Sequence, residues 1–227
     1  MIDPATVKLR DRLVEAVVPH IPFDGWGEAA LRAAARDIGI DEARARRLFP
    51  RLGLDLVTHF SDQADRRMEA LLGENDLQAM RLRDRVALAV RLRLESLNPH
   101  REAVRLAFGV MTLPPHGLDG LRCLYRTVDA IWFAIGDRST DVNFYTKRLL
   151  LAGVYLSTVL CWVGDESEGL EETWAFLARR IDDVMRLQKT RGRIERAMGE
   201  MPSPFMLLRL IVREGRAGRR GPRGASV

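Results

Sequence analysis

One stretch of the sequence, GDRSTDVNFYTKR at residues 136–148, gathers side chains that can bind another molecule through hydrogen bonds and ion pairs. It stands between two predominantly apolar stretches, LRCLYRTVDAIWFAI and LLLAGVYLSTVLCWVG. A solvated loop would explain its charges but not its aromatic residues, and a core segment would explain only the aromatic residues. The stretch is therefore the first candidate site of the chain.

Its first half needs no function. Gly136 is placed to end one helix, and Ser139, Thr140 or Asp141 is placed to cap the next by accepting hydrogen bonds from its first N–H groups. The second half is different, because Asn143 and Lys147 fall on one helical face. Two interpretations stay open for that face: a surface for a partner, and a polar network that joins two helices.

Patterns typical of enzymes and metal sites are absent from the sequence. It contains no GxGxxG, P-loop, GxSxG or HExxH pattern, and no Glu-x-x-His pairs of the kind that hold two iron ions. His59, Asp62 and Asp65 give no complete metal shell and predict a solvated helix face. The acidic run at 165–168 is expected to cap the next helix. We therefore expect a protein that is not an enzyme and has no metal or cofactor.

Composition predicts a reducing compartment and a sizeable core. The 227 residues are enough for a substantial core, and the two cysteines, Cys123 and Cys161, lie in apolar surroundings typical of small buried residues. A helix is expected to start within three residues of Met1, which leaves no room for a targeting segment and predicts a cytoplasmic protein. The apolar run at 149–163 is shorter than the roughly 20 residues of a typical transmembrane helix, so it predicts a buried helix.

The net charge of +5 lies entirely on the C-terminal segment, where six arginines and one glutamate follow Ser203. An amphipathic helix is expected at 203–213, and its arginines can attract an anionic membrane. The residues assigned to membrane binding are Phe205, Leu208, Arg209, Ile211, Val212 and Arg213. The alternative is a terminal helix that docks on the protein's own core.

The spacing of apolar residues is helical along nearly the whole chain, and no run alternates convincingly as a strand. The sequence therefore predicts an all-α protein. Helices are expected at residues 4–19, 27–38, 41–49, 53–72, 76–97, 101–111, 118–135, 141–163, 170–190 and 203–213. Breaks are expected at Pro22, Asn98-Pro99, Pro114-Pro115, Gly136 and Pro202.

Residues 31–49, LRAAARDIGIDEARARRLF, have a helix-turn-helix pattern, and this segment resembles the start of a TetR-type regulator. Ala35 lets two helices cross closely, and Gly39 can adopt the left-handed turn conformation. Residues 1–60 carry nine basic and nine acidic side chains, which argues against tight DNA binding. Four arginines keep that function open: Arg44, Arg46, Arg47 and Arg51.

The segments TVDAIWFAIGDRSTDVNFYTKR and LAGVYLSTVLCWVGDESEGLEETWAFLARRIDDVM closely resemble the Coq-nine family, the lipid-binding accessory proteins of ubiquinone biosynthesis. FDGWGEAALRAAARDIG is similar to the start of the same family, and the matching blocks run in order from about residue 10 to residue 188. The resemblance implies a TetR-like, all-helical and usually dimeric protein that does not act as a repressor.

In function, the resemblance implies a protein that binds isoprenoid-type lipids. Such a protein assists the di-iron hydroxylase that acts on demethoxyubiquinone, without performing the reaction. The implied organisation is a helix-turn-helix-like region at 1–51, a lipid- and partner-binding domain at 52–190, and an amphipathic helix with a basic tail at 191–227. The expected location is the inner face of the cytoplasmic membrane, as a peripheral protein.

The resemblance also assigns site residues. The hydroxylase-binding patch would comprise Asp129, Trp132, Phe133, Asp137, Ser139, Thr140, Asp141, Asn143, Tyr145, Lys147 and Arg148. The lipid pocket would use Leu150, Val154, Tyr155, Thr158 and Trp162. The family usually reads TDFNWYT[KR]R, whereas this chain has Val142 and Phe144, so the indole N–H at position 144 is lost.

A second function stays open on the sequence alone, namely a TetR-type transcriptional regulator that responds to a lipid and binds DNA. Salt-dependent binding to duplex DNA, lost when Arg46 and Arg47 are changed, would favour it.

Overall fold

The computed structural model describes residues 3–114, 116–137 and 142–198, and it leaves the side chains of residues 142–145 and 187–198 undescribed. By its contacts the chain divides into a unit of Met1–Ile181 and a unit of Asp182–Val227. The candidate sites described below lie in the first unit.

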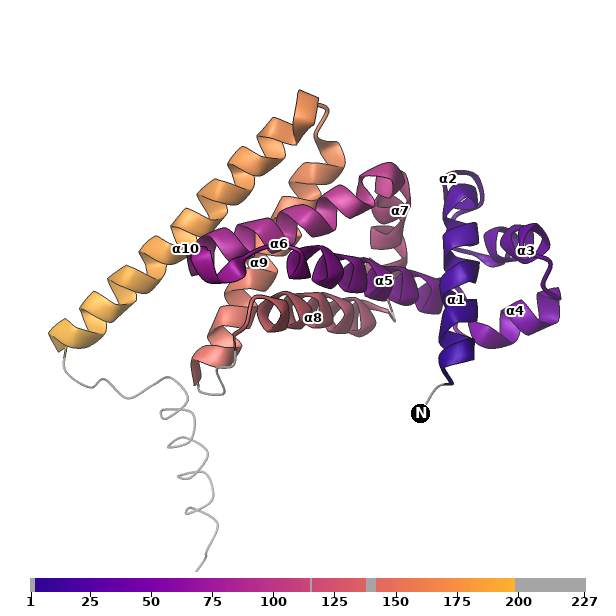
Figure 1. The fold of residues 1–227 in the computed structure, drawn as a ribbon, viewed down its shortest axis with the longest axis horizontal. Helices are drawn as coiled ribbons and strands as arrows, with labels where there is room; N and C mark the ends of the chain where they lie inside the picture. Colours follow the sequence, from indigo (N-terminus) through magenta and orange to yellow (C-terminus); the bar gives the residue numbers. More distant parts are fainter. Residues whose placement is uncertain (1–2, 115, 138–141, 199–227) are drawn as a thin grey trace, which may run out of the picture. The chain divides into compact units, whose positions relative to one another are not determined.

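All regular structure in the described ranges is helical, which confirms the predicted fold class (Figure 1). The helices are α1 (Pro4–Val17), α2 (Ile21–Asp24), α3 (Glu28–Asp37), α4 (Glu42–Leu48), α5 (Gly53–Gly73), α6 (Leu82–Leu97), α7 (Arg101–Thr112), α8 (Gly117–Ala134), α9 (Val142–Gly164) and α10 (Glu171–Met198). Short 3-10 turns occupy Val18–His20, Leu77–Ala79, Asn98–His100 and Glu168–Leu170.

The structure differs from the expected helices in three places, one of which is the end of α10 at Met198 rather than at residue 190. Pro22 was expected between helices but lies in the first turn of α2, where its missing N–H breaks no helical hydrogen bond. The helix expected at 76–97 begins only at Leu82, because Met80 and Arg81 have extended backbones. The helix expected at 203–213 lies outside the described residues.

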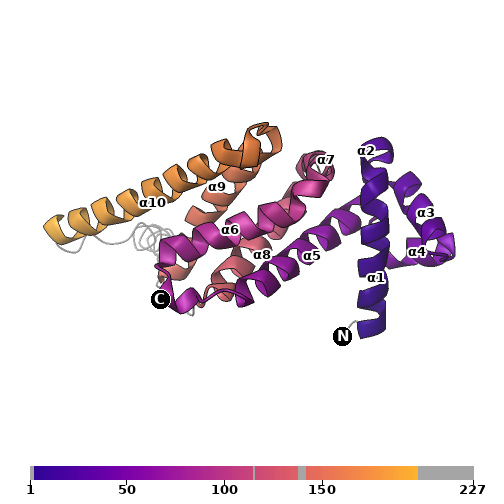
Figure 2. The ribbon, with the colours of Figure 1, turned by 45° about the horizontal axis from the view of Figure 1, so that its top comes forward.

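The helix-turn-helix forms as expected at one end of the first unit, where α3 and α4 lie on the far side of α1 from α5 (Figures 1 and 2). Ala35 is fully buried, and Gly39 has a φ of 67° in the turn between the two helices. Asp41 caps α4 by accepting a hydrogen bond from the N–H of Arg44 at 2.8 Å.

Helix α5 lies at the centre of the unit and packs against α1, α6, α7 and α8. Its start is held close to the N-terminal segment, since a Cβ on Gly53 would overlap the carbonyl oxygen of Trp26. The indole N–H of Trp26 in turn donates to the carbonyl oxygen of Ala103 in α7, at 2.9 Å. Trp26 therefore joins the helix-turn-helix segment to the helices that carry the candidate site.

Helix α9 packs against α6, α7 and α8. Its segment Thr146–Gly164 has the length and hydropathy of a membrane span, and 39% of its most apolar stretch is buried in the structure. The buried residues include Leu151, Val159 and Trp162. The helix therefore has the length and hydropathy of a membrane span, which the sequence analysis did not expect. The expectation of a buried helix holds for one side only, because Leu149 and Leu160 are 75% and 59% exposed.

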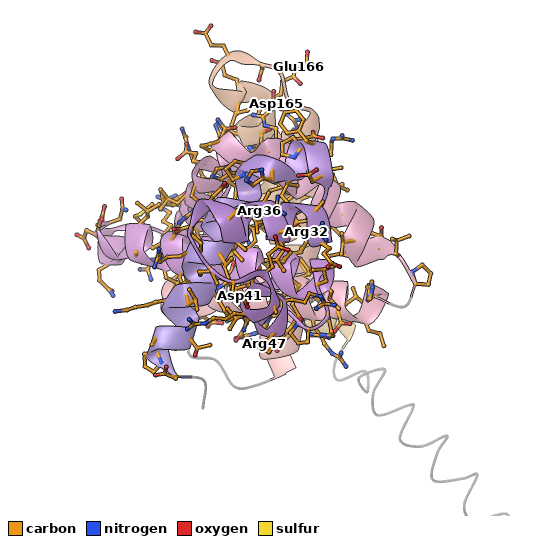
Figure 3. The ribbon with its side chains drawn as sticks, turned by 90° about the vertical axis from the view of Figure 1, so that its right-hand side faces the viewer. Arg32, Arg36, Asp41, Arg47, Asp165 and Glu166 are labelled. Carbon is orange, nitrogen blue, oxygen red and sulfur yellow. The ribbon has the colours of Figure 1, made fainter. Side chains whose placement is uncertain are left out.

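The turn after α9 is organised by Asp165, whose carboxylate accepts hydrogen bonds from the N–H and hydroxyl groups of Ser167 and Thr173. Burial acts to raise the pKa of Asp165, but these hydrogen bonds lower it well below its usual range. Figure 3 places Asp165 and Glu166 together at this turn. The expected capping role of the acidic run is confirmed for Asp165.

Candidate functional site

An apolar cavity of about 420 Å³ lies among α5, α6, α7, α8 and α9. Most of its wall is hydrocarbon, including the side chains of Phe60, Leu97 and Phe108. Leu121 and Leu156 also line it, and they are 63% and 38% exposed. The cavity therefore reaches the protein surface beside these two leucines of α8 and α9.

One part of the wall is polar, and it is built around Arg93 of α6. The guanidinium Nε donates to Asp65 Oδ1 of α5 at 2.7 Å, and Nη1 donates to the hydroxyl of Tyr155 in α9. Nη2 donates to the hydroxyl of Ser61 at 2.9 Å and to that of Thr127 at 3.3 Å. Arg93, Ser61, Thr127 and Tyr155 all line the cavity, so this network forms its polar wall.

Charge in the polar wall is balanced. Burial acts to lower the pKa of Arg93, but the neighbouring Tyr155 and Asp65 outweigh it, so that pKa is raised and the guanidinium stays charged. Burial raises the pKa of Tyr155 to about 12, which keeps its phenol protonated. The arginine charge is therefore matched by one buried carboxylate, Asp65.

Only one of the five predicted lipid-pocket residues lines the cavity. Tyr155 lines the cavity, whereas Leu150, Val154, Thr158 and Trp162 are not among its lining residues. Their lipid-binding role stays a prediction. Sequence reasoning looked for the pocket on one apolar helix, but most of the wall comes from α5, α7 and α8.

Arg93 was missed by the sequence analysis, although a signal for it was present. Buried residues of α6 recur at helical spacing as Val86, Ala89, Val90, Arg93, Leu94 and Leu97. An arginine on the apolar face of a helix needs a buried partner, which points to an internal polar network. Cys123, expected to be buried, is a free thiol of intermediate exposure that also lines the cavity.

The second candidate site is the junction between the end of α8 and the start of α9. An Arg148 guanidinium nitrogen lies 2.6 Å from Asp129 Oδ1, and Lys147 Nζ lies 3.2 Å from Asp137 Oδ1. The Lys147 ammonium also lies 5.7 Å from the ring centre of Trp132, within the range of a cation–π interaction. The Arg148–Asp129 pair joins α9 to α8, which agrees with a polar network between two helices, and the surface for a partner stays a prediction.

Exposure divides the predicted hydroxylase-binding residues. Phe133 is 75% exposed, whereas Trp132 is 6% exposed and its indole N–H has no hydrogen-bond partner among the residues that the structure describes. Arg148 is buried as well, while the Asp129 side chain remains 47% exposed. The side chains of Ser139, Thr140, Asp141, Asn143 and Tyr145 lie outside the described part of the chain.

The arginines that kept DNA binding open are partly engaged within the protein. Arg46 donates to the carbonyl oxygens of Phe49 and Pro50, and Arg51 pairs with Asp55 at 2.9 Å. Arg44 and Arg47 are exposed. Figure 3 shows Asp41 and Arg47, with Arg32 and Arg36, on the side of the helix-turn-helix that faces the viewer.

The helix face expected to be solvated at His59 and Asp65 is in fact buried. His59 Nε2 lies 2.7 Å from Asp11 Oδ1 of α1, and Asp65 binds Arg93. This expectation was wrong because α1 and α6 both pack against α5, which no local pattern revealed. Within the described ranges, no group of three or more histidine, cysteine, aspartate or glutamate residues is arranged to hold a metal ion.

Comparison with known proteins confirms the resemblance found in the sequence. A family model described as COQ9 matches residues 118–188. The mitochondrial ubiquinone biosynthesis protein COQ9 of Bos taurus is 34% identical over 199 residues, with 83% of this chain and 61% of that protein aligned. COQ9 of Drosophila melanogaster is 30% identical over 212 residues, with 90% of this chain and 65% of that protein aligned. The chain therefore spans roughly three fifths of the length of these relatives.

A solved structure supports the fold class. The crystal structure of a TetR transcriptional regulator from Nitrosomonas europaea superposes with a TM-score of 0.62 and covers 77% of this chain and 97% of its own. The two chains are 22% identical, so the likeness concerns the fold. The chain has the TetR-like, all-helical fold that the sequence predicts.

Proposed function

From the similarity of this chain to the COQ9 proteins of ubiquinone biosynthesis, we propose that it is a non-catalytic, lipid-binding accessory protein of that pathway. It binds an isoprenoid quinone precursor in the cavity among α5 to α9. It then presents the precursor, at a membrane surface, to the hydroxylase that acts on demethoxyubiquinone.

The cavity carries this proposal. Its volume of about 420 Å³ falls within the ~300–1,000 Å³ typical of ligand pockets, and its hydrocarbon wall suits an isoprenoid chain. The opening beside Leu121 and Leu156 gives such a chain a route to the surface. A lipid with part of its length inside the cavity would leave the remainder accessible to a membrane or a partner.

Native mass spectrometry of the purified protein tests lipid binding directly. We expect a co-purifying isoprenoid quinone or precursor in the wild type. Val104→Trp, which puts an indole into the cavity from α7, should lower its occupancy at least several-fold. Val110→Trp on the same helix is the matched control, since Val110 does not line the cavity. Equal lipid occupancy in wild type and both variants would contradict binding in this cavity.

Docking of the hydroxylase is proposed at the α8–α9 junction. Phe133 offers an exposed ring there, with the partly exposed Asp129 carboxylate one helical turn before it. Trp132 lies beneath Lys147 and supports the surface from below. Aromatic anchors with charged neighbours are common at protein interfaces.

Co-purification of the hydroxylase with Phe133→Ala tests this docking. We expect recovery of the hydroxylase to fall at least tenfold, because an aromatic anchor commonly contributes more than about 1.4 kcal/mol to binding. Phe23→Ala is the matched control, since Phe23 of α2 is 90% exposed and lies outside the junction. Equal recovery with both variants would show that Phe133 is not part of the docking surface.

A homodimer is the third element of the proposal. Exposed apolar side chains that do not line the cavity lie on two adjacent helices, with Leu118 on α8 and Leu149 and Leu160 on α9. Two copies would cover these side chains by forming a four-helix interface about a two-fold axis. Sedimentation velocity should show a dimer for the wild type and a monomer for Leu160→Glu, and a monomeric wild type would refute it.

The location is proposed to be a membrane surface, specifically the inner face of the cytoplasmic membrane. Support comes from the apolar lipid expected in the cavity and from the arginine-rich segment after Ser203. The names of the aligned relatives place those proteins in mitochondria.

A further inference from the structure

The cavity wall contains two hydroxyl groups whose hydrogens have no acceptor among the described residues. The Tyr155 and Ser61 oxygens both accept from Arg93, and a guanidinium can only donate. Each hydroxyl therefore keeps its own hydrogen for another bond. Among the described residues, neither hydroxyl donates to any acceptor, and both residues line the cavity.

The other hydroxyl groups of the wall already donate hydrogen bonds within the protein. The Thr127 hydroxyl donates to Asp65 Oδ2 at 3.1 Å, and Thr112 donates to the carbonyl oxygen of Phe108 at 2.7 Å in its own helix. Asp65 also accepts a hydrogen bond from Arg93, so both of its carboxylate oxygens are used within the protein. The polar wall therefore offers a ligand two O–H donors, from Ser61 and Tyr155, in an otherwise apolar cavity.

The balance of charge restricts what those donors can bind. Arg93 is matched by Asp65 at 2.7 Å, so an anionic ligand would add an unmatched charge to a buried site. An ammonium group would bring only donors to a wall that itself donates. An uncharged oxygen that accepts hydrogen bonds, such as a carbonyl or an ether, suits the wall best.

Building on the proposed lipid binding, we propose that Ser61 and Tyr155 donate hydrogen bonds to a carbonyl or ether oxygen in the head of a neutral lipid. The hydrocarbon chain of that lipid lies along the apolar wall. Arg93 is a positioning residue, because its bonds to the two oxygens direct both hydroxyl hydrogens away from itself and toward the cavity.

Probes with matched chains test the inference. Binding of 2-dodecanone, dodecane and dodecylamine is measured by displacement of an environment-sensitive fluorescent probe from the full chain. We expect the ketone to bind about tenfold more tightly than the alkane, since one hydrogen bond in a buried site contributes about this factor. The amine should bind no better than the alkane.

Tyr155→Phe removes one donor and keeps the ring, so ketone affinity should fall about three- to tenfold while alkane affinity stays unchanged. Ser61→Ala should act in the same direction and serves as the second variant if Tyr155→Phe does not fold. Tyr125→Phe is the matched control, because Tyr125 is 45% exposed and does not line the cavity.

Equal binding of ketone and alkane by the wild type would overturn this inference while leaving lipid binding intact. Tightest binding of the amine, or an unchanged ketone preference in both Tyr155→Phe and Ser61→Ala, would overturn it as well. If no probe binds, both the inference and the proposed lipid binding fail.

Discussion

At the scale of single residues, the buried polar groups of α5 bind the neighbouring helices α1 and α6. His59 contacts α1 through Asp11, and Asp65 contacts α6 through Arg93. Gln63 also donates to the backbone oxygen of Asp11, at 3.0 Å. Burying such groups without partners is costly, so each one selects the neighbour that satisfies it.

Asp65→Ala should destabilise the fold by about 3–5 kcal/mol, because it leaves the Arg93 charge buried without its carboxylate partner. Urea unfolding followed by circular dichroism measures this loss. Asp62→Ala is the control on the same helix: Asp62 pairs with Arg126 near the surface, and exposed pairs contribute about 0–1 kcal/mol. Equal losses in the two variants would contradict the special role of Asp65.

His59 should make the protein less stable below neutral pH. Burial lowers its pKa from the ordinary value of 6.5, despite the hydrogen bond to Asp11. As the pH falls through 6.5 the unfolded chain takes up a proton that the folded chain still refuses. Stability present above pH 6.5 is therefore lost as the pH falls toward the lowered pKa.

The thermal midpoint, measured from pH 7.5 to pH 5.5, should accordingly fall more steeply for wild type than for His59→Gln. Some dependence will remain in the variant, because burial lowers the pKa of His100 in the same direction. Parallel pH profiles would show that His59 does not contribute.

At the scale of helices, the two ends of α5 differ in how closely other parts of the chain approach their glycines. Gly53 begins the helix directly beneath the carbonyl group of Trp26, whereas a Cβ on Gly73 would meet no atom within 4 Å. Glycine is therefore needed for the close packing at the start of α5, whereas the structure leaves room for a side chain at its end.

Gly53→Ala should destabilise the protein by about 1–3 kcal/mol, since the added methyl group must push a backbone carbonyl away. Gly73→Ala is the matched control and should be neutral or stabilising by up to about 1 kcal/mol, because alanine favours the helix. Differential scanning calorimetry of both variants checks the contrast. A Gly53→Ala protein as stable as wild type would refute the close approach.

At the scale of the whole molecule, the excess positive charge belongs to the C-terminal segment of the sequence. The segment from Ser203 onward carries the net charge of +5, and the rest of the chain is formally neutral. Electrostatic attraction to an anionic membrane would therefore act through this segment, and the lipid proposed above would occupy the cavity.

Removal of residues 203–227 should abolish co-flotation with vesicles of phosphatidylcholine and phosphatidylserine, because each arginine near the surface contributes about 1 kcal/mol. The full chain should float with these vesicles and lose binding at high salt. Pure phosphatidylcholine vesicles are the control for charge. Unchanged flotation of the truncated chain would contradict membrane anchoring and favour docking of the segment on the protein itself.

Most helices were predictable because their causes are local. Apolar spacing placed α3, α5, α7 and α8 within one or two residues of their observed bounds, and Gly39 and Gly136 mark turns with positive φ as expected. The cavity was not predictable in this way, because its wall combines side chains of five helices. The burial of Trp132 was not predictable either, because its neighbours in the sequence are typical of an interface and only the packing of the helices buries it.

The sequence by itself therefore determined the all-helical fold, its helix-turn-helix and its relation to the COQ9 proteins, because periodicity, capping residues and motifs are properties of neighbouring positions. Only the tertiary structure decided which polar side chains face the cavity. Arg93 meets Asp65 and Tyr155 across separations of 28 and 62 residues, respectively. Such pairs form where helices pack, and burial makes each polar group take the partner that packing provides.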